Sequence, residues 1–420
     1  MVGWVWFWIF GGVSVGLADW REQIEKFHPS LTLQEQYNDN LNLTKEDKIS
    51  DFITTLYPGL KYLAVGNGYS FDLKYELGMN FYADHTENNY LSHDGILKTW
   101  YAFNPHWTVR LNDSLTRSRD RVGIPYTVTT PTGETTVNNL DSGEGLFLRN
   151  IFEPSVDYKF GREDMVTLLY RNMIYRTDGT GEDSTDNSAF GRLQYWFNIH
   201  HGLFLDYTYS NAEFSVSPDW VGNNLGGRYV YRFNPRTLAY GEYRFSIRDF
   251  EFPSQDYAVH SPTIGGEHAF SPTLSGAARL GWFWQVVDVG PSFNGPVYSL
   301  SSSLRGAQTT FTVSFDGGFR EEFFTSDNLG PSKYNQLTLA VTHKLQQRLT
   351  VGFSGSVDRS EYQSPDDRID WIYSVSGSLS YQPLRWLIIS LVATNQTRDS
   401  ELDQNSYNQN KVILRLTAEF

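Results

Sequence analysis

The sequence predicts an all-β protein, a transmembrane antiparallel up-and-down β-barrel of about 20 strands, within a range of about 18 to 22. Three observations support this fold: long segments alternate apolar and polar residues, tight turns recur between them, and the composition is polar yet aromatic-rich. Mean hydropathy is -0.42, although 16% of the 420 residues are aromatic. A membrane barrel hides apolar residues at every second position and gathers aromatic residues at its two interfaces, which explains both values.

The first 18 residues are uncharged and apolar, and they end in the small residues Gly16 and Ala18. This pattern is typical of a secretory signal peptide cleaved after Ala18, although no lysine or arginine precedes the apolar run. A retained transmembrane helix is the alternative, because the run is at the short limit for crossing a bilayer. We expect residues 19–30 to form a short periplasmic segment and residues 31–420 to form the barrel.

The clearest strand spans residues 69–84. Its apolar residues occupy one face at seven consecutive odd positions, namely Tyr69, Phe71, Leu73, Tyr75, Leu77, Met79 and Phe81. Such a period of two excludes a helix, whose faces recur every three to four residues. The same alternation recurs at 107–116, 228–233, 243–248 and 371–381. It also occurs at 311–320, where Phe311, Val313, Phe315 and Phe319 share the predicted lipid-facing side.

Tight turns and long loops alternate along the chain. Aromatic residues precede turns at 101–105, 231–235, 269–272 and 381–383, and comparable turns occur at 197–202 and 344–348. Longer, acidic loops are predicted at 38–50, 86–89, 177–187, 249–256, 321–332, 360–370 and 398–404. Short turns at one end and long loops at the other are typical of the periplasmic and extracellular ends of bacterial barrels. The weakly patterned segment 256–268 makes the strand count least certain there.

The longest loop spans residues 119–145. Residues 126–130 and 135–137 indicate a small hairpin inside it, separated by Pro131 and Gly133. The hairpin could fold inward and constrict the barrel, or stand outward as an extension.

The final ten residues alternate Val412, Leu414, Leu416, Ala418 and Phe420 with mostly polar residues. A terminal strand that closes on an aromatic residue resembles the assembly signal of bacterial outer-membrane barrels, and an ordinary edge strand is the alternative. We assign the signal to Leu414, Leu416 and Phe420, with the barrel-assembly machinery as the expected partner.

Strand parity predicts which charged residues face the barrel interior. The set comprises Arg110, Arg192, Arg228, Arg232, Arg244, Arg248, Arg279 and Arg320, together with Asp72, Glu76, Asp206, Glu242, Asp316 and Asp358. Later strands add a serine wall of Ser299, Ser301, Ser303, Ser354, Ser356, Ser374, Ser376 and Ser378. One interpretation is an arginine track that attracts anionic or sugar-like solutes. The other is that cross-strand acids neutralise the arginines, so the ion preference stays open.

Composition and spacing exclude several classes of function. The chain has no cysteine, which rules out disulfides and thiolate metal sites, and its net charge of -14 argues against a nucleic-acid partner. Phosphate-binding glycine loops and zinc spacings are absent, so we predict no cofactor and no metal. Adjacent His260 and Ser261 lie on opposite faces of a strand, and no other spacing predicts a catalytic site. The acidic loop residues Asp178, Glu182, Asp183 and Asp186 indicate a solvated loop or a divalent-bridged contact with lipopolysaccharide.

Residues 37–44 (YNDNLNLT) and 51–59 (DFITTLYPG) resemble a largely uncharacterised family of outer-membrane β-barrel porins, some of them encoded beside exopolysaccharide genes. The resemblance implies a Gram-negative outer-membrane protein with pore activity, and it implies no catalytic residues. We therefore expect a non-enzymatic channel for passive passage of small hydrophilic solutes. The alternatives are a component of exopolysaccharide export and a structural barrel plugged by its loops.

Overall fold

The computed structural model describes residues 26–119, 125–130, 133–138, 145–178, 181–251, 256–287, 292–323, 330–362 and 368–420. The predicted signal peptide and most of the predicted periplasmic segment lie outside these residues. In the described part of the chain, no helix is long and apolar enough to cross a membrane.

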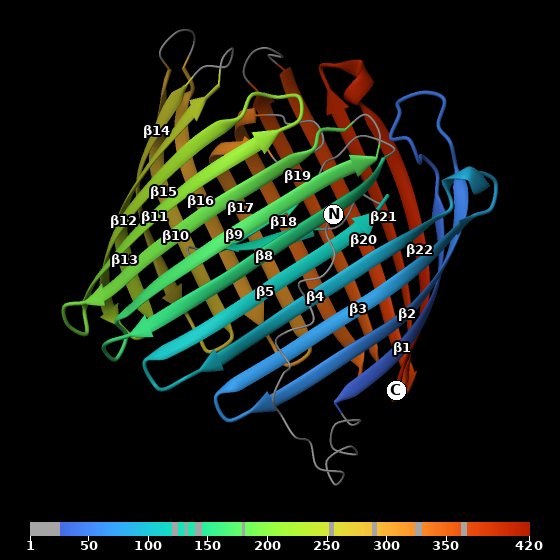
Figure 1. Cartoon of the computed structure of the whole chain (residues 1–420), viewed down its shortest axis with the longest axis horizontal. Helices are drawn as coiled ribbons and strands as arrows, with labels where there is room; N and C mark the ends of the chain where they lie inside the picture. The colour runs from blue at the N-terminus through green and yellow to red at the C-terminus, as the bar shows by residue number, and fades with distance from the viewer. Residues whose placement is uncertain are drawn as a thin grey trace.

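Twenty strands form one closed antiparallel sheet, in which each strand pairs with its neighbours along the chain (Figure 1). The predicted fold class is confirmed. The barrel strands are β1 (Phe27–Asn38), β2 (Asp51–Gly66), β3 (Tyr69–Tyr82), β4 (Tyr90–Ala102), β5 (Trp107–Ser118), β8 (Leu146–Lys159), β9 (Met165–Asp178), β10 (Ser184–Trp196), β11 (His201–Phe214), β12 (Trp220–Asn234), β13 (Thr237–Phe250), β14 (Tyr257–Ala269), β15 (Leu274–Val287), β16 (Asn294–Arg305), β17 (Thr309–Glu322), β18 (Gly330–Gln346), β19 (Leu349–Tyr362), β20 (Arg368–Leu384), β21 (Leu387–Ser400) and β22 (Tyr407–Glu419).

The first and last strands close the barrel. Residues 30–38 of β1 pair with residues 411–419 of β22, and the backbone N–H of Phe420 donates to the carbonyl of Pro29 at 3.0 Å. The barrel therefore begins at Phe27 and not at residue 31, because the first residues of β1 also pair with the end of β2. Figure 1 shows the C-terminus at the end of the barrel that carries the short turns.

Most predicted loops and turns have the expected positions, with a few corrections. The loop at 215–219 was not predicted, and the predicted loop at 177–187 is shorter, because β10 already begins at Ser184. The weakly patterned segment 256–268 forms β14. Its pairing with β15 skips Ser261 and Pro262, because proline has no amide N–H to donate. Inside the longest loop, β6 (Pro125–Thr130) and β7 (Gly133–Asn138) pair as the predicted hairpin.

The two faces of the sheet differ in chemistry as the alternation predicts. Leu168 and Ile264 are 60% and 70% exposed on the outer face, whereas Asp157 and Thr55 are 3% and 0% exposed on the inner face. Aromatic rings flank the short turns, for example Tyr101 with Phe103, whose centroids lie 4.8 Å apart. An apolar outer face bordered by aromatic rings is the surface that a lipid bilayer requires.

One strand departs from the regular wall. The pairing of β16 with β17 stops at Tyr298 and Gly317, whereas β17 stays paired with β18 as far as Glu322. Gly317 leaves room for the ring of Tyr298, since an added Cβ would collide with that ring, and Pro296 of β16 lacks an amide N–H. The end of β17 is therefore free to move away from β16.

The freed end of β17 packs inside the barrel. The ring of Phe319 lies 5.5 Å from that of Phe283 on the inner face of β15 and 6.2 Å from that of Tyr257 on β14. The ring of Phe323 lies 5.3 Å from that of Trp220 on β12. The prediction that Phe319 faces lipid is thus wrong. Strand parity places Phe319 on the outer side of β17. Because this end of β17 lies inside the barrel, its outer side faces the inner surface of β14 and β15.

Asp51, at the extracellular start of β2, holds the loop between β3 and β4. Its carboxylate accepts hydrogen bonds from the backbone N–H groups of Ala83, Asp84 and His85 at 3.0–3.1 Å. The same carboxylate lies 2.9 Å from Nδ1 of the His85 ring. This hydrogen bond to Asp51 raises the pKa of His85 above its ordinary value of 6.5.

We expect the loop at 83–89 to loosen as the pH rises. A histidine whose pKa is raised by folding contributes stability that is complete below the unfolded pKa and lost as the pH passes the raised value. Amide hydrogen exchange of residues 83–89, corrected for the intrinsic rate, should therefore accelerate between about pH 6 and pH 9. The His85→Asn variant should lack this dependence. If amide exchange in the His85→Asn variant depended on pH as it does in the wild type, the ion pair between His85 and Asp51 would not be what holds the loop.

Candidate functional site

The barrel interior is the candidate site, and the structure places all eight predicted arginines on its inner wall. Seven of them lie on β10–β17 and Arg110 lies on β5. Asp72 and Glu76 belong to a different sector, on β3, where they pair with lysines: Asp72 lies 3.5 Å from Lys61, and Glu76 lies 2.8 Å from Lys74. The structure thus pairs Asp206 and Glu242 with arginines, gives Asp316 a serine hydroxyl as its partner, and leaves Asp72 and Glu76 apart.

Most of the arginines pair with acids, and three of them do so across adjacent strands. Arg192 pairs with Asp206 at 2.5 Å, Arg228 with Glu242 at 2.7 Å, and Arg320 with Asp358 at 3.0 Å. Their opposite positions in the sheet explain two of these pairs, since Arg192 faces Asp206 and Arg228 faces Glu242 across adjacent strands. Cross-strand neutralisation therefore describes this part of the wall.

Three further carboxylates pair with predicted arginines but were not in the predicted set. Asp157 binds Arg110, Glu163 binds Arg232 at 2.8 Å, and Glu321 binds Arg248 at 2.6 Å. Strand parity could have identified Asp157, because its strand β8 pairs with β5, which carries Arg110, and both side chains point inward. Glu163 lies in a turn, and Glu321 reaches the interior only because β17 leaves the wall, so parity gives no signal for either.

Two arginines are only partly satisfied. Arg244 shares the carboxylate of Glu242 with Arg228, so that one acid serves two guanidinium groups. Arg279 has no hydrogen bond or ion pair with any described residue, and its Nε atom is buried without a partner. Asp316 instead accepts a hydrogen bond from the Ser299 hydroxyl at 2.6 Å.

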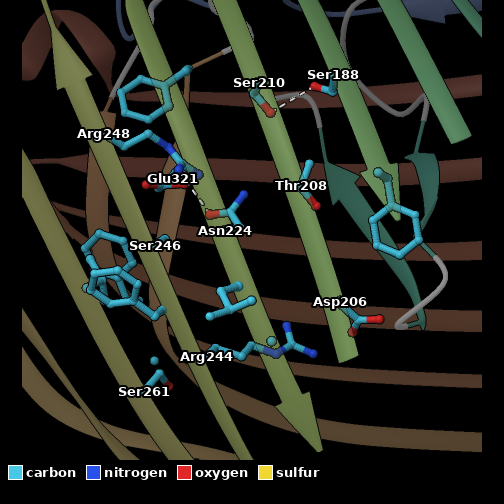
Figure 2. A pocket seen from close by; sticks show the side chains of 18 of the residues that line it. Ser188, Asp206, Thr208, Ser210, Asn224, Arg244, Ser246, Arg248, Ser261 and Glu321 are labelled. Carbon is cyan, nitrogen blue, oxygen red and sulfur yellow. Dashed lines mark hydrogen bonds and ion pairs between the residues drawn. The ribbon is translucent and has the colours of Figure 1, made fainter. Parts of the chain in front are cut away.

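A cavity of about 520 Å³ lies in this sector (Figure 2). Its walls come from β9–β18 and include Arg244, Arg248 and Arg279, with the carboxylates of Asp186, Asp206 and Glu321. Figure 2 shows Arg248 beside Glu321 at one level and Arg244 nearer to Asp206 at another. Hydroxyl groups line the surface between them, from Ser188, Thr208, Ser210, Ser246, Ser261 and Thr263.

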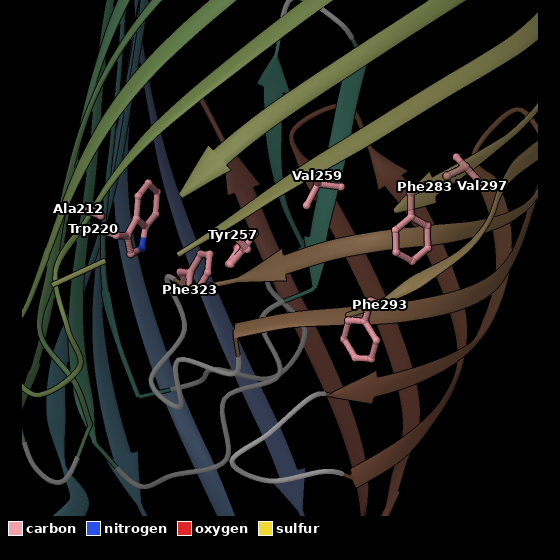
Figure 3. Close-up of a cluster of buried hydrophobic side chains, with 8 residues drawn as sticks. All are labelled: Ala212, Trp220, Tyr257, Val259, Phe283, Phe293, Val297 and Phe323. Atoms are coloured by element: carbon pink, nitrogen blue, oxygen red, sulfur yellow. The ribbon is translucent and has the colours of Figure 1, made fainter. Parts of the chain in front are cut away.

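An apolar cluster borders this cavity on the extracellular side (Figure 3). Its buried members are Ala212, Trp220, Tyr257, Val259, Phe283, Phe293, Val297 and Phe323. Figure 3 shows Phe323 next to Tyr257, where the chain after β17 meets the inner face of β14. Glu321 fixes this contact, since it accepts a hydrogen bond from the Tyr257 hydroxyl at 2.6 Å in addition to pairing with Arg248. The cluster therefore narrows one sector of the barrel interior.

A second cavity, of about 430 Å³, lies below the first and involves part of the predicted serine wall. Its lining includes Ser301, Ser303, Thr312, Ser314 and Thr338. The charged residues Arg232, Arg236 and Glu267 line it as well, on the side formed by β12–β14, opposite the serines. The remaining predicted serines, Ser354, Ser356, Ser374, Ser376 and Ser378, continue the wall on β19 and β20, where Ser354 faces Ser376 and Ser356 faces Ser374.

His260 and the acidic loop residues have structural contacts. The His260 ring faces outward, with Nδ1 2.6 Å from the Tyr243 hydroxyl and its centroid 5.4 Å from that of Trp284, whereas Ser261 lines the inner cavity. Glu182 accepts hydrogen bonds from the N–H groups of Val216 and Ser217. Asp186 is not a loop residue, because it lies in β10 and accepts a hydrogen bond from Ser188 inside the barrel.

Residues 219–420 match the family described as "Putative beta-barrel porin 2". This match confirms the resemblance to outer-membrane β-barrel porins that the sequence motifs indicated, and it covers β12–β22. Together with the closed barrel and its apolar outer face, it identifies an integral outer-membrane protein with a porin-like fold. No curated protein sequence matches the chain.

Solved structures share the architecture. The siderophore receptor PirA from Pseudomonas aeruginosa is 9% identical with a TM-score of 0.52, over 94% of this chain and 80% of that chain. The ferric enterobactin receptor PfeA, solved with BCV-L6, is 10% identical with a TM-score of 0.53, over 94% and 81%. A BenF-like porin from Pseudomonas fluorescens Pf-5 is 10% identical with a TM-score of 0.47, over 94% and 99%. At these identities the likeness to the two receptors concerns the fold alone.

Proposed function

We propose that this chain, an outer-membrane β-barrel whose residues 219–420 match a porin family, lets small hydrophilic solutes pass passively through its interior. The observation that carries the proposal is the polar inner wall, which holds cavities of about 520 Å³ and about 430 Å³ one above the other. A barrel of 20 strands is wide enough to enclose water unless its loops fill it. Paired charges and serines make a surface that water and polar solutes can wet.

The inward end of β17 supports a narrowed channel more than a plugged barrel. Its apolar cluster joins β11, β12, β14–β17 and the loop before β16, which is one sector of the wall. The serines of β19 and β20 lie outside this cluster and keep a polar surface. We further propose that the channel is not an enzyme, because His260 and Ser261, the adjacent pair that the sequence singled out, face opposite sides of the wall.

Liposome swelling tests the proposal. Refolded protein in liposomes should admit neutral sugars at rates that fall with increasing sugar size, as expected for diffusion through a narrowed pore. Protein-free liposomes and liposomes with heat-denatured protein provide the background rate. A folded barrel that admits the smallest sugar no faster than this background would overturn the proposal and favour the plugged alternative.

We also propose that Leu414, Leu416 and Phe420 present an assembly signal to the barrel-assembly machinery. In the folded barrel Phe420 is 70% exposed, and its ring stacks on that of Trp386 with centroids 6.2 Å apart. Its side chain therefore contributes little to packing. Leu414 and Leu416 are 43% and 38% exposed on the outer face of the closing strand, toward membrane lipid and lipopolysaccharide.

Deleting Phe420 is expected to reduce the amount of assembled, heat-modifiable barrel in outer membranes severalfold, while refolding in detergent is unaffected. The physical reason is that the residue makes few contacts in the folded state but ends the strand that the machinery would recognise. Leu384→Ala is a matched control, because Leu384 is also an exposed apolar residue near the periplasmic end. Equal losses of assembled barrel in cells and of refolded barrel in detergent would show that Phe420 acts through stability alone.

A further inference from the structure

Arg279 is a charged group inside the barrel whose side chain has no partner among the described residues. It lies on the wall of the cavity of about 520 Å³, and no described residue forms an ion pair or hydrogen bond with it. Removing a guanidinium from water without providing an acceptor is unfavourable. Its position on a cavity wall gives an outside anion a place to bind.

The nearest acid in the same row of the sheet is already engaged. Arg279 on β15 faces Ser299 on β16, and Ser299 faces Asp316 on β17. Ser299 lies between the two charges, and its hydroxyl donates to the Asp316 carboxylate at 2.6 Å. The fold thus separates Arg279 from the carboxylate that would most directly neutralise it.

A second guanidinium faces the same cavity with donors to spare. Arg244 binds Glu242 through its Nε atom, and Glu242 also receives two hydrogen bonds from Arg228. No described residue accepts a hydrogen bond from the two terminal nitrogens of Arg244. Figure 2 shows this guanidinium within the group of side chains that line the cavity. A ligand there meets one unpaired cation and one that is only partly paired.

The rest of the lining matches the body of a sugar. The hydroxyls of Thr208, Ser246 and Ser261 line the cavity and have no hydrogen-bond partner among the described residues, so they can donate to and accept from ligand hydroxyls. Trp220 and Phe319 present aromatic surface at the extracellular side, against which the C–H face of a sugar ring can pack. A cavity of this volume is within the usual range for small-ligand sites.

We infer that this cavity binds a small hydroxylated carboxylate, of which a hexuronate is the simplest example, with Arg279 holding the carboxylate. The inference rests on the proposed channel function and gives it a solute class. Arginine is suited to this role, because its planar guanidinium can donate two parallel hydrogen bonds to one carboxylate. The neutral hydroxyls and the aromatic surface then select for the sugar body, which a simple anion such as chloride lacks.

Calorimetric titration of the refolded full chain in detergent with glucuronate, and with glucose as the neutral analogue, tests this inference. The wild-type protein should bind glucuronate more tightly than glucose. The Arg279→Gln variant should bind glucuronate about tenfold more weakly, the loss expected for a charge-assisted hydrogen bond, and should bind glucose unchanged. Equal glucuronate affinity in wild type and Arg279→Gln, or no preference over glucose in the wild type, would overturn the inference.

The control variant is Arg232→Gln, which removes the same charge from the barrel interior. Arg232 pairs with Glu163 and lines the lower cavity, so this variant should bind glucuronate as the wild type does. A similar loss in both variants would show that the overall interior charge, and not a site at Arg279, attracts the anion, and would also overturn the inference.

Transport measurements distinguish a failure of this inference from a failure of the proposed function. Liposomes that admit neutral sugars while the protein shows no glucuronate preference would leave the channel proposal intact and refute the site. Glucuronate binding that depends on Arg279, in a barrel that admits no solute, would support the site and refute passive passage.

Discussion

Replacing Asp370 with alanine is expected to lower the free energy of unfolding by about 3–5 kcal/mol, the usual effect of removing one partner from a buried ion pair. Asp370 and Arg398 are 0% and 1% exposed, and their side chains lie 2.7 Å apart. Arg368, 7% exposed, approaches the same carboxylate at 3.4 Å. The substitution therefore leaves two buried guanidinium groups without their acid.

Urea unfolding of the refolded barrel in detergent, followed by tryptophan fluorescence, measures this loss. Asp72→Ala is the matched control, because Asp72 pairs with Lys61 at 3.5 Å but both side chains are more than one-third exposed. Exposed pairs contribute only about 0–1 kcal/mol, so the control should change little. Similar small effects in both variants would show that the Asp370 cluster is hydrated or otherwise compensated.

Detaching the inward end of β17 is expected to raise single-channel conductance on the order of twofold, since the open cross-section of a water-filled barrel limits ion flow. The double substitution Glu321→Ala with Phe323→Ala removes the ion pair to Arg248, the hydrogen bond from Tyr257 and the ring contact with Trp220. The ring contacts of Phe319 with Phe283 and Tyr257 remain in this variant, so the part of the chain beyond Phe319 should withdraw from β12 and β13.

The control for this prediction removes similar groups that do not join the end of β17 to β12 or β13. Glu361 pairs with Lys333 and Arg359, and Leu337 is 45% exposed on the outer side of β18. The Glu361→Ala with Leu337→Ala variant should conduct as the wild type does. An unchanged conductance in the β17 variant would mean that the apolar cluster does not limit the pore.

The barrel itself was predictable because its determinants are local. Alternation over 69–84 and the aromatic turn at 101–105 are properties of a few consecutive residues, and each strand pairs with its neighbour in the chain. The same parity placed Arg192 and Asp206 on the inward face, where the structure pairs them directly across adjacent strands.

The inward end of β17 could not be predicted in the same way. Phe319 and Glu321 have lipid-facing parity, and their actual contacts with Phe283 and Arg248 span several strands. Gly317, which leaves space for Tyr298, is the main local signal, but glycine also occurs in strands at bulges and at tight bends that stay within the wall. The isolation of Arg279 likewise depends on Ser299 binding Asp316, a side-chain choice that strand parity does not determine.

Single-channel recording of the refolded protein in a planar bilayer, with reversal potentials in asymmetric salt, tests the central claim most directly. The account predicts steady conductance steps and a reversal potential that shifts toward cation preference in Arg279→Gln, because that variant removes the unpaired positive charge from the pore wall. A folded, heat-modifiable barrel that inserts without conductance steps would contradict the open channel on which the proposed function depends.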